Sequence, residues 1–260
     1  MVQAVDATSF ITTSEASYQA FKTATLLKTL SVNALIMGEI GVGKRSLATF
    51  ILPDASIVDA SAHDELLASL ESCSELIITN IDNSPNIKRL IETIKVHHVR
   101  VIATAKQAYS NEFIDELFSV KFDIPPLSER EDDLHELVKL FESEAALLFG
   151  GEQVLDLTYF KPDLKENAKS LKRQVMISYL LQGVKDSELM DIIERYLYDK
   201  LGSNSDYRNF LYLYEVPLIK AGLSRFKSQL QLSDKLGLNR NTLRKKIAEN
   251  KKYLQGDKNE

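Results

Sequence analysis

The stretch ALIMGEIGVGK, which runs from Ala34 to Lys44, decides the fold of this 260-residue chain. Four apolar residues lead into a loop with three glycines, and an apolar-periodic segment continues from the loop to Ile51. This order predicts a strand, a tight loop and a helix. The spacing Gly38-x-x-x-x-Gly43-Lys44 fits a phosphate-binding loop, in which backbone N–H groups, the start of a helix and a lysine surround phosphate groups.

The residue after the loop lysine departs from the common pattern. Arg45 stands where a serine or threonine usually supplies a hydroxyl for magnesium, and Ser46 comes one position later. Two interpretations therefore stay open for this segment. It is either a nucleotide-binding loop or a tight strand-to-helix turn whose backbone needs glycine.

Short apolar runs and helical patterns alternate through the first half of the chain. The apolar runs are Ser56–Asp59, Leu76–Ile81 and Val99–Thr104, and the helical patterns between them are His63–Leu70 and Asn86–Val96. Such alternation predicts a parallel sheet with crossover helices.

The pattern becomes helical after Pro125-Pro126. An apolar stripe at helical spacing runs from Glu129 to Phe149, and the rest of the chain reads as all-helical. The polar, glycine-containing stretch Gly202–Asp206 interrupts this pattern and predicts a linker.

Composition limits the classes of protein to which the chain can belong. With 44% hydrophobic and 27% charged residues, it is typical of a globular protein with two domains. No apolar run reaches the roughly 18 residues of a membrane helix, and no secretory signal begins the chain, so we expect a cytoplasmic protein without a membrane partner. One cysteine excludes an internal disulfide, and four histidines without cysteine partners at ligand spacing predict no metal site.

Charge is distributed unevenly, although the formal net charge is only -5. Between Lys220 and Lys252, ten lysines and arginines stand against Asp234 and Glu249, so the remainder of the chain is strongly acidic. Because a basic segment attracts the DNA backbone while an acidic body is repelled by it, this asymmetry predicts double-stranded DNA as the partner of the tail.

The basic tail also has the apolar spacing of two short helices. Leu232 and Leu236 precede Gly237, which permits a left-handed turn, and Leu243 and Ile247 follow it. The pattern predicts a helix-turn-helix, with a solvated basic surface helix as the alternative. The predicted DNA-binding residues are Asn239, Arg240, Asn241, Thr242, Arg244, Lys245 and Lys246.

The glycine loop resembles that of sigma-54-dependent activators, the NtrC-like branch of AAA+ ATPases. Other landmarks of that family follow in its order. Leu76–Asp82 resembles the strand that carries the catalytic carboxylates, and Val99–Thr104 resembles the sensor I strand. Phe113–Phe118 resembles the family's phenylalanine signature, and Pro125–Leu134 resembles its proline signature. Asn167–Leu171 resembles the sensor II segment. The resemblance implies an α/β, AAA+-like P-loop sheet followed by an α-helical subdomain.

Departures from the family pattern predict that hydrolysis is lost. Thr79 and Asn80 stand where the family has its two catalytic carboxylates. Lys106 replaces the sensor I asparagine, and Lys169 replaces the sensor II arginine. The segment before Pro125 has no arginine that could act as an arginine finger. We therefore expect no catalytic residues. The hexapeptide with which sigma-54 activators contact the sigma factor does not occur in the sequence, so activation by that route is not expected.

If the loop binds a nucleotide, ATP or ADP is then a ligand rather than a substrate. The residues predicted to bind it are Gly38, Glu39, Gly41, Gly43, Lys44, Arg45, Ser46 and, through the resemblance, Lys169.

The predicted helix-turn-helix resembles the Fis-type module at the carboxyl end of the same activators. Leu236–Leu238, Arg240, Thr242–Arg244 and Lys246 match its signature residue by residue. Such modules dimerise through the helix pair before the helix-turn-helix, where this chain has apolar residues between 210 and 223. The resemblance implies a homodimer on a roughly palindromic site, with packing of these residues on the chain's own helical subdomain as the alternative.

The predicted organisation is a degenerate AAA+ α/β core in residues 1–128, a lid-like helical subdomain in 129–201 and a Fis-type helix-turn-helix in 207–254. The leading hypothesis is a sequence-specific DNA-binding transcriptional regulator with a non-hydrolysing core. One alternative is a working sigma-54-type ATPase whose missing groups come from Asp82 or a neighbouring subunit. The other is an adaptor that binds another regulator through its acidic body and uses the basic tail only for nonspecific contact. RNA polymerase is a further candidate partner.

Overall fold

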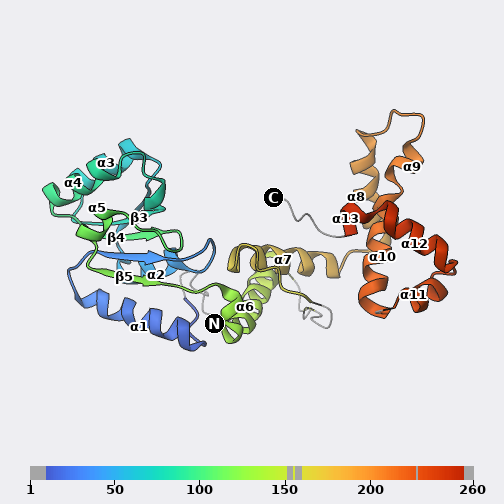
Figure 1. The fold of residues 1–260 in the computed structure, drawn as a ribbon, viewed down its shortest axis with the longest axis horizontal. Helices are drawn as coiled ribbons and strands as arrows, with labels where there is room; N and C mark the ends of the chain where they lie inside the picture. Colours follow the sequence, from blue (N-terminus) through green and yellow to red (C-terminus); the bar gives the residue numbers. More distant parts are fainter. Residues whose placement is uncertain (1–9, 151–154, 156–159, 227, 255–260) are drawn as a thin grey trace. The chain divides into compact units, whose positions relative to one another are not determined.

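Five parallel strands form the sheet of the amino-terminal unit, in the order β2-β3-β4-β1-β5 (Figure 1). The computed structural model describes residues 10–150, 155, 160–226 and 228–254. The strands are β1 (Ala34–Met37), β2 (Ser56–Asp59), β3 (Glu75–Thr79), β4 (Arg100–Ala105) and β5 (Val120–Asp123). Because β1 pairs with β4 on one side and β5 on the other, the glycine loop leaves the sheet between two neighbouring strands.

Helices cover both faces of the sheet (Figure 1). Residues alternate along each strand, so that Ile36 packs into one layer and Leu35 into the other. The first layer contains α1 (Glu15–Thr29) and α2 (Lys44–Ile51), and the second contains α3 (His63–Ser72), α4 (Ile87–His97) and α5 (Glu112–Leu117).

The predicted fold class is confirmed, and two predicted strands, Ala34–Met37 and Ser56–Asp59, coincide with β1 and β2. The strand β5 was not predicted from the sequence. Its four residues are all half-buried or exposed, because only β1 flanks this edge strand. A short edge strand without a buried apolar run gives little periodic signal.

A helical subdomain completes the amino-terminal unit. The helices α6 (Glu131–Phe149) and α7 (Ala168–Gln182) share a buried core in which Phe141 and Val175 take part. The single-turn helices of the unit are η1 (Ile81–Asn83) and η2 (Leu127–Glu129).

The carboxyl-terminal unit begins at Lys185, and in its described residues it consists of helices joined by short turns. Its small core joins Ile219, Leu232 and Leu243. The helices are α8 (Asp186–Tyr198), α9 (Asp206–Phe210), α10 (Tyr212–Phe226), α11 (Gln229–Lys235), α12 (Arg240–Glu249) and α13 (Lys251–Leu254). In the described residues, none of the helices of either unit combines the length and apolar character that a membrane span requires.

The boundary between the two units falls after Val184, so α8 belongs to the carboxyl-terminal unit. The sequence pattern predicts that this segment belongs to the helical subdomain and that Gly202–Asp206 is a linker. That stretch is instead a tight turn between α8 and α9. The Asp206 carboxylate accepts hydrogen bonds from the backbone N–H groups of Gly202 and Ser203, at 2.7 and 2.9 Å. Glycine and polar residues signal a turn, and this one joins two helices of the same unit.

Candidate nucleotide pocket and nucleic-acid interface

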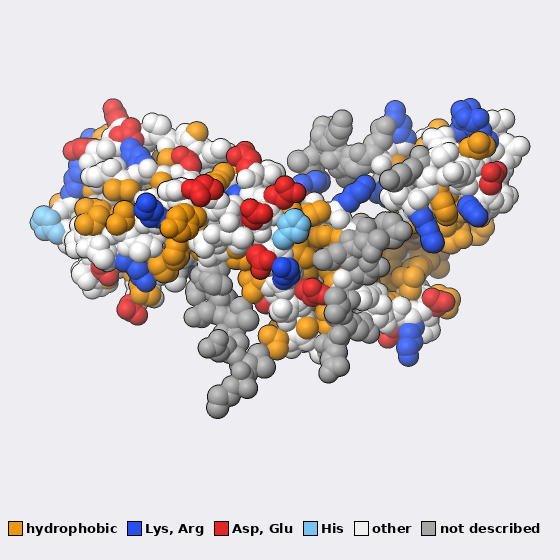
Figure 2. Space-filling view, turned by 90° about the horizontal axis from the view of Figure 1, so that it is seen from below, with side chains coloured by type: hydrophobic (Ala, Val, Ile, Leu, Met, Phe, Trp, Pro, Cys, Tyr) orange, Lys and Arg blue, Asp and Glu red, His pale blue; other side chains and the backbone are white. Residues whose placement is uncertain are grey.

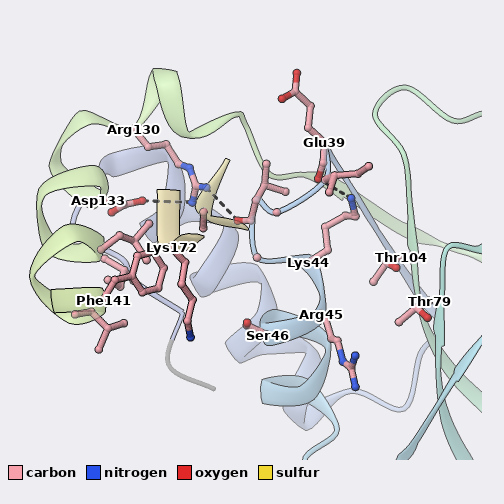
Figure 3. Close-up of a pocket in the computed structure, with 18 of the residues that line it drawn as sticks. Glu39, Lys44, Arg45, Ser46, Thr79, Thr104, Arg130, Asp133, Phe141 and Lys172 are labelled. Carbon is pink, nitrogen blue, oxygen red and sulfur yellow. Dashed lines mark hydrogen bonds and ion pairs between the residues drawn. The ribbon is translucent and has the colours of Figure 1, made fainter. Parts of the chain in front are cut away.

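A cavity of about 480 Å³ lies at the carboxyl edge of the sheet, between the glycine loop and the helical subdomain (Figure 3). Of the predicted nucleotide-binding residues, its lining includes Glu39, Gly41, Gly43, Lys44, Arg45 and Ser46. Gly38 turns the chain out of β1 with a φ of 146°, and a side chain there would meet the carbonyl oxygen of Ile124. The structure thus brings most of the predicted loop residues to one cavity.

The Lys44 side chain folds back over its own loop (Figure 3). Its ammonium group donates hydrogen bonds to the carbonyl oxygens of Gly38 and Glu39, at 2.6 and 2.7 Å. Burial lowers the pKa of Lys44, and the nearby charges of Asp82 and Glu39 oppose that effect. The ammonium therefore sits at the cavity wall, already oriented by two backbone acceptors.

The glycine loop is clamped by the segment that begins α7. The side-chain amide of Asn167 donates hydrogen bonds to the Glu39 carboxylate and to the Ile40 carbonyl, and the N–H group of Ala168 donates to the Gly41 carbonyl. A Cβ atom at Gly41 would lie only 2.0 Å from the Glu166 carbonyl oxygen. Glycine at this position therefore allows the loop and the helical subdomain to touch backbone to backbone.

A buried ion pair joins the glycine loop to α1 and α6 (Figure 3). Arg130 is 3% exposed and Asp133 is fully buried. The guanidinium lies 3.4 Å from the carboxylate and donates to the Ser17 hydroxyl and, at 3.0 Å, to the Val42 carbonyl. The carboxylate also accepts from the N–H and hydroxyl groups of Ser14, at 2.8 and 3.0 Å. Both charges line the cavity, and sequence reasoning did not single them out.

Polar residues at the ends of β2, β3 and β4 form the opposite wall of the cavity. The Asp59 carboxylate accepts hydrogen bonds from Thr79 at 3.1 Å, from Asn80 at 2.7 Å and from Ser61. Partial burial raises the pKa of Asp59, but these hydrogen bonds outweigh it and hold that pKa below its ordinary value. The Thr104 hydroxyl accepts from the Asn80 N–H at 3.1 Å.

Two lysines predicted at sensor positions lie outside the cavity lining. Lys169 pairs with Glu166 at 3.0 Å, and Lys106 is exposed near the Tyr109 ring. The lining contains instead Lys172, which lies one turn after Lys169 on α7, and Thr104, which lies two residues before Lys106. The helical period of α7 could have identified Lys172, because residues three apart share one face.

The predicted DNA-binding residues gather on α12 and its amino-terminal cap, in the second helix of the predicted helix-turn-helix. Gly237, with a φ of 63°, ends α11 in a Schellman motif, because the Leu238 N–H reaches the Ser233 carbonyl at 2.9 Å. The Asn239 side chain then caps α12 by accepting from the Asn241 N–H at 2.8 Å. Exposed side chains follow at Arg240, Asn241, Thr242, Arg244 and Lys245. In Figure 2, separate Lys and Arg side chains are visible on the surfaces of both units.

Lys246 differs from the other predicted DNA-binding residues. Its ammonium group pairs with Glu215 of α10, and the two side chains are 28% and 13% exposed. Asn250 donates a second hydrogen bond to the same carboxylate at 3.3 Å. Lys246 therefore helps to hold α12 against α10. The pairing links residues 31 positions apart, and no local pattern could have signalled it.

Comparison with known proteins gives fold similarity without close sequence relatives. No family model and no curated protein matches the chain. Among solved structures, NtrX from Brucella abortus in complex with ADP is similar over 93% of this chain and 69% of that one, with 18% identity and a TM-score of 0.57.

NtrX in complex with ATP is similar over 92% of this chain and 68% of that one, with 16% identity and a TM-score of 0.57. DnaA from Aquifex aeolicus, bound to AMPPCP, gives a TM-score of only 0.46 at 15% identity, over 95% and 90% of the two chains. The NtrX similarity, together with the observed strand order, shows that the chain has an AAA+ fold.

Proposed function

We propose that this protein is a sequence-specific DNA-binding regulator of transcription whose degenerate AAA+ core holds a nucleotide without hydrolysing it. The observation that carries the proposal is the arrangement of α12. Its buried face is fixed by Leu243 and by the Lys246–Glu215 pair, while Arg240, Asn241 and Arg244 stand exposed. A helix held in this way after a tight turn can enter the major groove and present its side chains to base edges.

A homodimer is part of this proposal. An apolar groove of about 630 Å³ in the carboxyl-terminal unit lies between α8 and the α9–α10 segment. The apolar side chains of α8 are largely exposed, with Met190 at 63% and Ile192 at 53%. A second copy would cover this surface and place two recognition helices about one DNA turn apart.

The nucleotide part of the proposal is supported by the cavity and by NtrX, which has been solved with ADP and with ATP. The absence of hydrolysis is supported by the strand ends, where Thr79 and Asn80 offer no carboxylate to position an attacking water. Phosphate release by the purified protein should therefore equal the buffer background. Turnover that disappears in Lys44→Ala would contradict this and favour the working ATPase.

In vitro selection of DNA bound by the full chain tests the DNA-binding part. We expect an inverted repeat whose half-sites are separated by about one helical turn, because a two-fold symmetric dimer reads a symmetric site. Binding without any preferred sequence, and uniformly weakened by salt, would contradict sequence-specific binding and favour the adaptor.

Arg240→Ala and Arg244→Ala should each weaken binding to the selected sequence by about 1–3 kcal/mol, or roughly 5-fold to 150-fold, and relax base preference at one position. Gel-shift titration of single-base variants of the site measures both effects. Arg89→Ala, which removes an exposed arginine of α4 in the amino-terminal unit, is the matched control and should bind like the parent. An equal loss in all three variants would count against α12 as the reading helix.

Lys245→Ala and Lys246→Ala should separate a phosphate contact from a structural one. Lys245 is 78% exposed, so its loss should reduce the dependence of log affinity on log salt by about one. Lys246 is held by Glu215, so its loss should leave that slope unchanged and cost about 1.5–3 kcal/mol of unfolding free energy. Salt titrations and thermal melts of the two variants make the comparison, and a reduced slope in Lys246→Ala would reverse its assignment.

A further inference from the structure

The cavity lacks a place for the magnesium ion that P-loop sites ordinarily hold. In such sites a hydroxyl after the loop lysine and a carboxylate at a strand end bind the ion. Here the first position is Arg45, and the strand end is Thr79-Asn80. A guanidinium cannot bind a cation, and Thr79 and Asn80 offer only neutral oxygen atoms, whereas Mg²⁺ in proteins is usually held by one or two carboxylates. The donor set therefore does not fit the ion.

The carboxylates in the cavity lining are already engaged. Asp59 accepts from Ser61, Thr79 and Asn80, and Glu144 pairs with Lys172 at 2.5 Å. Glu39 accepts from Asn167, and Asp133 belongs to the buried pair with Arg130. In the described part of the chain, no three acidic, histidine or cysteine side chains are grouped to hold a metal.

Arg45 supplies a different kind of positive charge at this place. It begins the first turn of α2 next to Lys44, and its side chain lies on the side of Thr79 and Thr104 in Figure 3. Within the described part of the chain, no hydrogen bond or ion pair holds its guanidinium. A guanidinium is always charged, and its forked N–H groups match two phosphate oxygens at once.

We propose that the cavity binds a nucleoside diphosphate or triphosphate without a divalent cation, and that the Arg45 guanidinium takes the place of the metal against the terminal phosphate. The inference rests on the proposed nucleotide binding and specifies which positive charges neutralise the phosphates. Lys44 and Arg45 together offer two positive charges, while the free N–H groups of the loop and of the first turn of α2 donate hydrogen bonds to the remaining phosphate oxygens. A metal ion would find, in the cavity lining, only carboxylates that are already hydrogen-bonded or ion-paired.

Equilibrium dialysis of the full chain with radiolabelled ADP, in EDTA and in excess MgCl₂, tests the inference. We expect the dissociation constants of ADP in EDTA and in MgCl₂ to agree within about twofold, because the site offers no free ligand to the ion. Arg45→Ala should weaken binding in EDTA by about 10-fold to 100-fold, which is the usual effect of losing a charged hydrogen bond. Arg89→Ala should bind like the parent. Melting curves establish that both variants are folded, as expected for exposed positions.

The outcomes separate this inference from the proposed function. Binding that requires MgCl₂ and is lost in EDTA would overturn metal independence while leaving nucleotide binding intact. Equal affinity of Arg45→Ala and the parent would overturn the role of Arg45. No ADP binding in either buffer would overturn nucleotide binding itself, and the inference would fall with it.

Discussion

Replacing Asp133 with alanine is expected to lower the unfolding free energy of the amino-terminal unit by about 3–5 kcal/mol. The substitution leaves the Arg130 guanidinium buried without its counter-charge, and it removes the carboxylate to which the Ser14 N–H and the hydroxyl groups of Ser14 and Ser17 donate. Breaking one partner of a buried pair is costly because the remaining charge has neither water nor an ion to stabilise it. The effect should appear in calorimetry as a lower melting transition of this unit.

Asp132→Ala provides the matched control, since Asp132 is the neighbouring aspartate in the first turn of α6 and is exposed. Its loss removes only a favourable interaction with the helix dipole, which is about 0.3–1 kcal/mol at an exposed position. If the two variants lose the same stability, or if Asp133→Ala melts like the parent, the buried network does not stabilise the unit as its geometry indicates.

Leu232→Ala is expected to cost the carboxyl-terminal unit about 2–5 kcal/mol and to abolish specific DNA binding with it. Leu232 is fully buried between α10 and α12, in a core whose other buried members are Ile219 and Leu243. Its side chain fills the space above Gly222, where an added Cβ atom would lie 2.3 Å from Leu232 Cδ1. Because this core is small, the remaining buried side chains cannot compensate for the apolar contacts that the Leu232 side chain provides.

The control for this substitution lies two residues earlier on the same helix. Leu230 is 54% exposed, so Leu230→Ala should change stability by less than about 0.5 kcal/mol and leave DNA affinity unchanged. Helicity followed by circular dichroism, together with gel shifts on the selected site, measures both quantities. A Leu232→Ala protein that keeps full helicity and full affinity at 37 °C would contradict the assigned core.

The α/β part of the fold was predictable because its signals are local. Residues 34–44 contain a strand, a glycine loop and the start of a helix in one continuous stretch. The buried strands β3 and β4 are recognisable as apolar runs. The edge strand β5 has neither a buried run nor a distinctive turn. It therefore escaped prediction, although its partner β1 was predicted to the residue.

The site was less predictable, because its geometry depends on contacts between distant residues. The loop residues follow from one motif, but the Asp59 bonds to Thr79 and Asn80 join two separate strands, and the Asn167 bonds span 127 and 128 positions. The same limit applies to Lys246. Its sequence context predicts a phosphate contact, whereas Glu215 on another helix determines where its charge lies.

The clamp between Gly41 and the start of α7 also bears on how the amino-terminal unit loses its structure. The α/β core and the helical subdomain are joined by the backbone hydrogen bond from Ala168 to Gly41, by the Asn167 amide and by the Arg130 side chain, so neither part can open without exposing polar groups of the other. The two parts should therefore unfold as one cooperative block, with equal hydrogen-exchange protection for the slowest amides of the sheet and of α7.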